Sequence, residues 1–345
     1  MGRGAERKEP MFVRQKKTVA SAGDPILGNG VMFAPICGVS DSAYRRVCRE
    51  MGAGVLFSEM ISAEGLAFGA WGSWKMLKFH PEEEPLSIQL STASPDYMAK
   101  ACSLVEELGV SSININMGCP ARKVVKGDKG AGLMKNPDLA AKVVEKAVAA
   151  VKIPVTVKMR SGWTEQTINY LELGRKVQEA GARAVILHPR TRKQAYSGFA
   201  NWDHIRNLKE ELDVPVIGNG DVVDGQSAVN MLKHTACDGI MIARGSFGNP
   251  WIFREVLAAV EGRPIPPRPS GKEIYEAIRR QVELKLEDTL ARFVSNPMKK
   301  HMVWYSKGLA DSAEFRQVVV RQQSIEKQLK ICKDFFMNST YGNET

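Results

Sequence analysis

The stretch "PVTVKMRSGWTEQTINYLELGRKVQEAGARAVILH", residues 154–188, holds two short apolar runs with a helical pattern between them. The runs at 154–160 and 184–188 are rich in β-branched and aliphatic residues, which is typical of buried strands. In the segment 167–181, apolar side chains recur at helical spacing. This order of strand, helix and strand predicts a parallel βα unit followed by the first strand of the next unit.

The same alternation extends in both directions along the chain. Eight apolar runs recur at roughly thirty-residue spacing, each leading to a helical pattern; they are residues 30–36, 54–60, 86–90, 111–116, 154–160, 184–188, 215–221 and 239–245. Eight such units predict an α/β protein with a (β/α)8 TIM barrel, here residues 26–260. An open doubly wound sheet is the alternative, but the G-x-G-x-x-G motif expected after its first strand is missing.

Both ends of the chain differ from the predicted barrel. Residues 261–271, "EGRPIPPRPSG", are dense in proline and predict a linker. Helical patterns at 272–290, 296–309 and 313–336 predict a small all-helical domain over residues 272–345. The first seventeen residues hold six basic and two acidic side chains with little apolar pattern. We therefore predict a basic flexible tail over residues 1–25.

Composition limits the class of protein and its partners. An apolar content of 44% and a charged content of 25% are typical of soluble proteins. Apolar runs are too short to span a bilayer and no signal-peptide core occurs, so we expect a cytoplasmic protein without a membrane partner. Six scattered cysteines without a C-x-x-C pair argue against disulfides and metal. The net charge of +10 favours nucleic acid as the partner, with a solvated basic surface as the alternative.

Chemistry in a TIM barrel collects at the carboxyl ends of the strands, where the loops form one mouth. The residues that follow or end the apolar runs are therefore the candidates for a site. They are Pro35, Ile36 and Cys37; Gln89; Asn114, Asn116 and Cys119; Lys158 and Arg160; His188 and Arg190; Asn219, Gly220 and Asp221; and Ala243, Arg244 and Gly245.

Two features of this set indicate an anionic ligand. Gly220 and Gly245 follow the last two strands, where barrels commonly bind phosphate, and Arg244 stands beside the second glycine. A glycine there can also serve only a turn. Lys158 alternates with apolar neighbours, so we expect it to point into the mouth together with Arg160. A buried lysine without an anion nearby is costly, which favours a functional role.

Several of these segments, taken in order, resemble one family. They are "NMGCPARKVVKGDKGAGLM" (116–134), "VKMRSGW" (157–163), "LHPRTRKQAYSGFANWDHI" (187–205), "GNGDV" (218–222), "GIMIARGSFGNPW" (239–251) and "KKHMVWYSKGL" (299–309). Together they resemble the bacterial tRNA-dihydrouridine synthases, particularly the B-type subfamily. The resemblance implies an FMN-dependent oxidoreductase that takes electrons from NADPH, or NADH, and reduces the C5–C6 double bond of uridines in tRNA to 5,6-dihydrouridine.

The resemblance also implies a role for each matching residue. Cys119 would donate the proton to C5 while FMN delivers a hydride to C6. The FMN-binding positions are Pro35, Ile36, Cys37, Gln89, Lys158, His188, Asn219, Gly220, Asp221, Ala243, Arg244 and Gly245. The substrate-binding positions are Asn116, Lys158, Arg160, His188 and Arg190. We expect the helical domain and the basic loop after Cys119 to hold the tRNA, and the protein to act as a monomer.

A few positions depart from the family pattern. Ile36 and Cys37 stand where Met and Ala are usual, and Arg122 stands where proline is common. The usual glycine is missing two or three residues after Gln89. Backbone contacts at positions 35–37 tolerate a change of side chain. Pro189 replaces a usual glycine and bears most directly on how His188 and Arg190 approach the substrate.

The chemistry fits a thiol that keeps its proton. Cysteine has an ordinary pKa of about 8.5 and is mostly protonated at neutral pH, so it can serve as a general acid without tuning. The closest alternative is an FMN barrel of the dihydroorotate dehydrogenase kind, acting on a free pyrimidine, but the basic helical segment argues against it. A catalytically inactive RNA-binding barrel is a further alternative, and the presence of Cys119, Lys158 and His188 argues against it. A phosphate-binding lyase or isomerase barrel is the third alternative.

Overall fold

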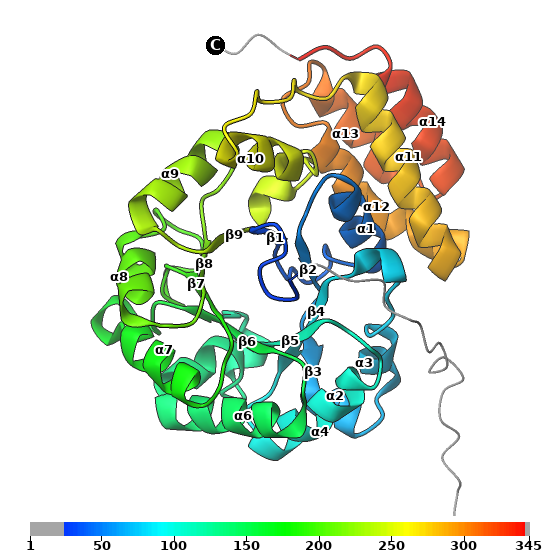
Figure 1. Ribbon diagram of the computed structural model, residues 1–345. Helices are drawn as coiled ribbons and strands as arrows, with labels where there is room; N and C mark the ends of the chain where they lie inside the picture. Colours follow the sequence, from blue (N-terminus) through cyan, green and yellow to red (C-terminus); the bar gives the residue numbers. More distant parts are fainter. Residues whose placement is uncertain (1–23, 342–345) are drawn as a thin grey trace, which may run out of the picture.

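Parallel strands form a closed barrel in the computed structural model, which describes residues 24–341 (Figure 1). Within that range the barrel strands are β1 (Val31–Phe33), β2 (Val55–Phe57), β4 (Leu86–Ser91), β5 (Ser112–Met117), β6 (Val155–Arg160), β7 (Val185–His188), β8 (Val216–Asn219) and β9 (Gly239–Ile242). The ring closes because β2 pairs in parallel with both β1 and β4. The predicted (β/α)8 barrel is confirmed and the open sheet is wrong. Nearly all of the tail predicted for residues 1–25 lies outside the described residues.

Helices cover the outside of this ring (Figure 1). The long helices between the strands and after β9 are α1 (Ser42–Glu50), α4 (Pro95–Glu106), α6 (Pro137–Ala150), α7 (Tyr170–Glu179), α8 (Asp203–Glu211), α9 (Gly225–Thr235) and α10 (Ile252–Val260). The local sequence explains where several of these helices begin. The Ser94 and Asn136 side chains accept hydrogen bonds from the first turns of α4 and α6, and proline occupies the first position of both helices.

The second apolar run departs from the prediction of one strand over 54–60. β2 ends at Phe57, and a two-residue strand, β3 (Ile61–Ser62), resumes the pairing with β4. Phe57 lies opposite Ser87 and Ile61 opposite Leu90, so four residue steps on one strand match three on the other. This extra residue interrupts the ladder as a bulge does. Two five-residue helices, α2 (Ala63–Ala67) and α3 (Trp71–Lys75), follow in place of one long helix.

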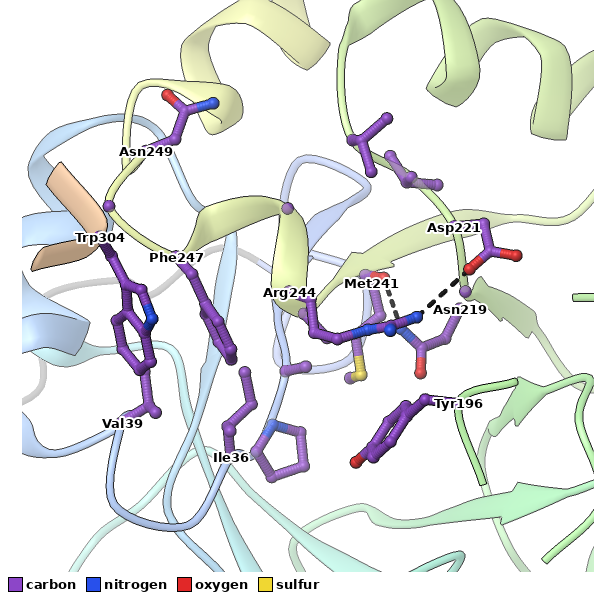
Figure 2. A pocket seen from close by; sticks show the side chains of 18 of the residues that line it. Ile36, Val39, Tyr196, Asn219, Asp221, Met241, Arg244, Phe247, Asn249 and Trp304 are labelled. Atoms are coloured by element: carbon purple, nitrogen blue, oxygen red, sulfur yellow. Dashed lines mark hydrogen bonds and ion pairs between the residues drawn. The ribbon is translucent and has the colours of Figure 1, made fainter. Parts of the chain in front are cut away.

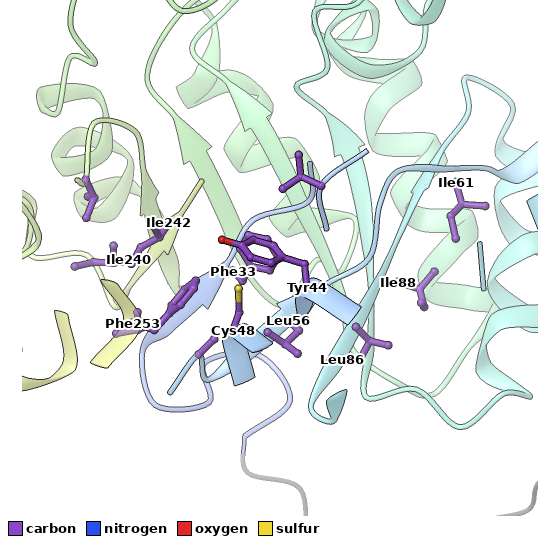
Figure 3. Packing of buried hydrophobic residues seen from close by; sticks show 14 of the residues in the cluster. Phe33, Tyr44, Cys48, Leu56, Ile61, Leu86, Ile88, Ile240, Ile242 and Phe253 are labelled. Carbon is purple, nitrogen blue, oxygen red and sulfur yellow. The ribbon is translucent and has the colours of Figure 1, made fainter. Parts of the chain in front are cut away.

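The barrel separates two apolar cores. The larger core lies between the strands and the surrounding helices and includes Phe33, Tyr44 and Phe253 (Figure 3). The smaller core lies inside the barrel and includes Met32, Phe57, Ile186 and Met241. On β4, β5 and β6 the inward positions are largely polar, while the alternate residues join the outer core. The part of the barrel interior that β4, β5 and β6 line is therefore suited to hydrogen bonding.

Four helices follow the proline-rich segment: α11 (Gly271–Asp288), α12 (Ala291–Tyr305), α13 (Ser312–Arg321) and α14 (Ile325–Phe336). The pattern over 313–336 is split into two helices. Ser324 accepts a hydrogen bond from Lys327 N and starts α14, while the buried Gln328 side chain donates to the Gln322 carbonyl. The short loop at 322–324 is therefore held by its own Ser324 and by Gln328 of the helix after it.

The C-terminal helices pack against one side of the barrel, beside α1 (Figure 1). Ion pairs join α1 to α11, with Arg46 2.6 Å from Glu287 and Arg280 2.8 Å from Glu50. Among residues 24–341, no helix combines the length and apolar character that crossing a membrane requires.

Candidate active site

A cavity of about 1650 Å³ opens at the carboxyl ends of the barrel strands and continues toward the C-terminal helices. All of the predicted site residues except Asn114 and Arg190 line it. They are Pro35, Ile36, Cys37, Gln89, Asn116, Cys119, Lys158, Arg160, His188, Asn219, Gly220, Asp221, Ala243, Arg244 and Gly245. These residues come from seven strands, so the closing of the barrel alone brings them together. Asn114 lies one layer deeper and holds Gln89.

A ladder of amide side chains crosses the floor of the cavity. Asn114 donates to Thr156 Oγ1 at 2.8 Å and accepts from Gln89 Nε2 at 2.7 Å. Gln89 in turn accepts from Asn116 Nδ2 at 2.7 Å. The three residues lie on neighbouring strands in matched register, which aligns their amides. The ladder fixes the orientation of Asn116 and leaves its Oδ1 atom facing the loop that follows β5.

The loop after β5 presents Cys119 to the cavity. Asn116 Oδ1 accepts from the backbone N–H of Cys119 at 2.9 Å, and the Cys119 carbonyl accepts from Ala131 N at 3.1 Å. Gly130, with φ of +56°, packs against the same residue, and a Cβ there would lie 2.9 Å from the Cys119 oxygen. The backbone of Cys119 is therefore held from both sides while its side chain stays half-exposed.

Lys158 lies inside the barrel beside this loop, and its Nζ donates to Asn219 Oδ1 at 2.8 Å. Asn219 is itself fixed, because its Nδ2 donates to the Met241 carbonyl at 2.7 Å. Burial, reinforced by the charge of Arg160, lowers the pKa of Lys158 to about 7. No carboxylate pairs with this amine among the described residues, so the site holds a cation without its own counter-ion.

Arg160 and His188 form the next part of the wall. Arg160 donates through Nε to the Gly118 carbonyl at 2.8 Å and through Nη1 to the carbonyls of Thr191 and Ala195. It thereby ties the Cys119 loop to the loop after β7. Burial lowers the pKa of Arg160 to about 10, so it stays charged at neutral pH. Burial and then the neighbouring cations hold the pKa of His188 well below its ordinary value, so the imidazole is neutral.

Arg190 lies behind the cavity wall instead of in it. Its guanidinium forms a two-pronged ion pair with Asp221, at 2.8 Å for both contacts, and also donates to the carbonyls of Ser197 and Gly198. Its remaining N–H lies 3.4 Å from His188 Nε2. All five donors of the group are therefore used inside the protein. Burial opposes ionisation of Asp221, but hydrogen bonds from Arg190 and Ala200 outweigh it and lower the pKa.

The loops after β8 and β9 form a cradle of backbone N–H groups. Within residues 24–341, the N–H groups of Asp221, Val222, Arg244 and Gly245 have no hydrogen-bond acceptor. Gly245 lets the loops approach, because a Cβ there would lie 2.5 Å from the Val222 carbonyl oxygen. Unpaired N–H groups with an arginine beside them are the donor set that a phosphate group needs. The cradle therefore fits the phosphate of a nucleotide cofactor.

Sequence reasoning missed two parts of the wall (Figure 2). Tyr196, on the loop after β7, lies against Arg244 with the guanidinium 4.8 Å from its ring centre. An aromatic residue in the otherwise polar segment after His188 is the signal that could have found it. On the opposite side, Trp304 of α12 stacks on Phe247 with ring centres 4.5 Å apart. This contribution from a distant helix has no local signal in the sequence.

Comparisons with known proteins agree with this geometry. The chain matches the family described as Dihydrouridine synthase (Dus) over residues 32–340. It is 38% identical to the "Probable tRNA-dihydrouridine synthase" of Rickettsia prowazekii (strain Madrid E), over 93% of this chain and 99% of that protein. It is 36% identical to the "tRNA-dihydrouridine synthase B" of Pasteurella multocida (strain Pm70), over 90% of this chain and 93% of that protein.

Among solved structures, the fold is similar to that of histamine dehydrogenase from Rhizobium sp. 4-9. The TM-score is 0.53 at 15% identity, and the match covers 74% of this chain and 49% of the other. At this identity the similarity concerns the barrel fold alone. The family match and the relatives together carry the assignment: this chain belongs to the dihydrouridine synthase family.

Proposed function

We propose that this protein reduces uridine in tRNA to 5,6-dihydrouridine, with FMN as its bound cofactor and NADPH as the reductant. The observation that carries the proposal is the convergence of Cys119, Lys158, Arg160 and His188 in one cavity beside a phosphate-binding cradle. The relatives are named for this reaction, which also disfavours a free pyrimidine as the substrate.

The residues of the cavity fit a flavin mononucleotide. The N–H groups of the β8 and β9 loops and Arg244 would hold its phosphate. Lys158 lacks a counter-ion and would neutralise negative charge that builds on the ring system. When bound, the reduced flavin would supply the hydride that adds to C6 of uracil.

Cys119 is suited to give the proton to C5. Its backbone is fixed by Asn116 and by the Gly130 turn, so the point from which the side chain extends into the cavity is set before the substrate arrives. A fixed donor at the correct distance supplies a proton at the carbon where negative charge develops. The charges of Lys158 and Arg160, both of which interact electrostatically with Cys119, would stabilise the resulting thiolate.

Arg160 and the neutral His188 would bind the uracil carbonyls, and Arg190 would act as a positioning residue. A neutral imidazole that accepts from Arg190 through Nε2 carries its proton on Nδ1, which can donate to a carbonyl. Since every N–H of Arg190 is already bonded, its contribution is to fix His188, Asp221 and the loop after β7.

The tRNA must present its uridine unstacked, because the cavity floor lies inside the barrel. Basic side chains surround the opening, among them Arg122, Arg192, Lys193 and Lys307. We propose that these side chains, together with the helices α11 to α14, grip the tRNA backbone. Lys129, one of the loop lysines, is committed to Glu64 at 2.8 Å, so it serves the RNA less directly.

The experiment incubates the purified protein and NADPH with unmodified tRNA, followed by nucleoside mass spectrometry and position mapping. We expect a yellow protein, a gain of two mass units at specific uridines, and no product when NADPH is omitted. A protein that FMN cannot reconstitute would contradict the cofactor proposal. A yellow protein that oxidises NADPH yet leaves tRNA unchanged would contradict the substrate proposal.

A further inference from the structure

Phe199 is an aromatic side chain left almost completely in solvent. It is 90% exposed, the highest exposed fraction among the large apolar residues of the described chain. Exposing an aromatic ring forfeits the burial that normally stabilises it. Phe199 makes no ring contact with another aromatic residue or cation among residues 24–341. Packing among residues 24–341 therefore does not explain its presence.

The backbone that carries Phe199 is held firmly on both sides. The carbonyls of Ser197 and Gly198, just before it, accept from Arg190. Ala200 N, just after it, donates to Asp221 Oδ2 at 2.7 Å. The partly buried ion pair between Arg190 and Asp221 thus holds both ends of the loop tip, residues 197–200. A rigid backbone that presents an exposed ring is arranged for binding, since little conformational entropy is lost on contact.

This tip stands at the edge of the cavity. The first part of the same loop, with Arg192, Lys193 and Tyr196, lines the cavity. Directly after Phe199, Ala200 packs against the turn at Gly220, where an added Cβ would lie 3.0 Å from the Ala200 Cβ and 3.1 Å from His188 Cδ2. The residue directly after Phe199 therefore packs against the wall of the cavity, while Phe199 itself faces solvent.

We propose that Phe199 is a stacking platform for a nucleobase that neighbours the target uridine. This inference rests on the proposed function, in which one uridine leaves the RNA stack and exposes the faces of its neighbours. The loop that carries the exposed Phe199 ring also carries Arg192 and Lys193, so it combines the two groups that single-stranded RNA requires, a π surface for bases and cations for phosphates. A protein partner would need a contiguous apolar patch, whereas the chain neighbours of Phe199 are the small residues Gly198 and Ala200.

The test compares Phe199→Ala, Phe199→Leu and Phe199→Trp in the flavin-loaded enzyme. Leucine is the matched control, because it keeps apolar volume but lacks a π face. The measurements are tRNA affinity by fluorescence anisotropy, kcat/KM for dihydrouridine formation, and NADPH oxidation with an artificial electron acceptor. We expect Ala and Leu to weaken tRNA binding and kcat/KM by roughly 5- to 100-fold, Trp to retain them, and NADPH oxidation to stay unchanged.

A base-specific contact is tested by a double-mutant cycle. Once the modified uridine is mapped, an abasic nucleotide is placed on either side of it, and the effects of Phe199→Ala and of the abasic site should then be non-additive at one side. Wild-type behaviour of Phe199→Ala, equal performance of Leu and Phe, or full additivity at both sides would overturn the proposal. If the wild type forms no dihydrouridine, the proposed function fails, and the anisotropy series still decides whether Phe199 binds RNA bases.

Discussion

Single residues show how the barrel prepares for an anionic ligand. Lys158 lies inside the barrel with one hydrogen bond, to Asn219, and its pKa falls to about 7 because burial disfavours the charged amine. A cation without a counter-ion destabilises the empty site. The same arrangement becomes favourable when negative charge arrives on a bound group. Lys158 therefore lowers the stability of the empty protein but favours binding of an anionic group.

The lowered pKa of Lys158 predicts that Lys158→Met changes the stability of the flavin-free protein in a pH-dependent way. The unfolded chain keeps a lysine pKa near 10.4, so between about pH 7 and 10 it binds more protons than the folded chain. Stability of the wild type therefore rises with pH in this window, and the variant lacks this contribution. Between pH 7 and 9, the free energy of unfolding of the wild type minus that of the variant should increase by about 1 kcal/mol per pH unit.

Denaturant unfolding at pH 7, 8 and 9 measures this difference. Lys142→Met, at an exposed lysine of α6, is the matched control. A gap between wild type and Lys158→Met that does not change with pH would show that the amine does not titrate in this window.

At this scale the sequence predicts side-chain direction but not side-chain partners. Strict alternation on the segment 154–160 was enough to place Lys158 and Arg160 on the inner face. The ion pair of Arg190 with Asp221 joins loops thirty-one residues apart, and its geometry depends on how both loops turn. The sequence therefore predicts that Arg190, at the end of a strand, binds the substrate, whereas the structure places it behind the cavity wall.

At the scale of elements, α12 helps to build the cavity although it lies outside the barrel. Lys300 donates to the Gly38 carbonyl on the loop after β1, while Glu59 accepts from the Gly38 N–H. Trp304, one turn later, stacks on Phe247 of the loop after β9. The next residue of that loop, Gly248, lies so close to the Trp304 backbone that a side chain at position 248 would clash with it. α12 therefore holds two loops that are predicted to bind the flavin (Figure 2).

We predict that Lys300→Ala weakens FMN binding by about 3- to 10-fold, because a charge-assisted hydrogen bond to the loop is lost. Lys299→Ala, at the neighbouring position of α12, is the matched control, and Lys300→Arg should recover part of the affinity. Quenching of flavin fluorescence measures the dissociation constant. Equal losses in the Lys299 and Lys300 variants, or no loss in Lys300→Ala, would show that α12 does not hold the loop.

Element positions follow from periodicity where one pattern dominates. Six of the eight strands lie within their predicted runs, and β4 and β5 extend one residue past theirs, because β-branched segments recur between helical ones. The interruption between β2 and β3 depends on a one-residue offset in pairing with β4, which periodicity cannot show. The break at 322–324 likewise depends on Ser324 and Gln328, polar residues that also occur inside helices.

At the scale of the whole molecule, charge and shape point to a large polyanion. The chain carries 48 Lys and Arg residues against 38 Asp and Glu residues, and the cavity runs from the barrel mouth to the C-terminal helices. A free pyrimidine would occupy only the barrel mouth. The extended basic opening supports a folded RNA that reaches both parts of the chain.

Binding of tRNA should therefore weaken steeply with salt. If about five phosphates are neutralised, raising monovalent salt from roughly 50 to 200 mM lowers the affinity by about 10²-fold or more, because condensed counter-ions are released on binding. Filter binding with one unmodified tRNA at four salt concentrations gives the slope. A flat response would favour a small substrate over RNA.

Whether Cys119 donates the proton to uracil C5 is tested by following the flavin and the RNA together in Cys119→Ala. Both enzymes are reduced with NADPH in the absence of oxygen and then mixed with unmodified tRNA. We expect the wild type to reoxidise and to form one dihydrouridine per flavin, while Cys119→Ala accepts electrons from NADPH normally but reoxidises at least about 10²-fold more slowly. Reoxidation of the variant at the wild-type rate with full product would contradict the account, because Cys119 would then not be the proton donor.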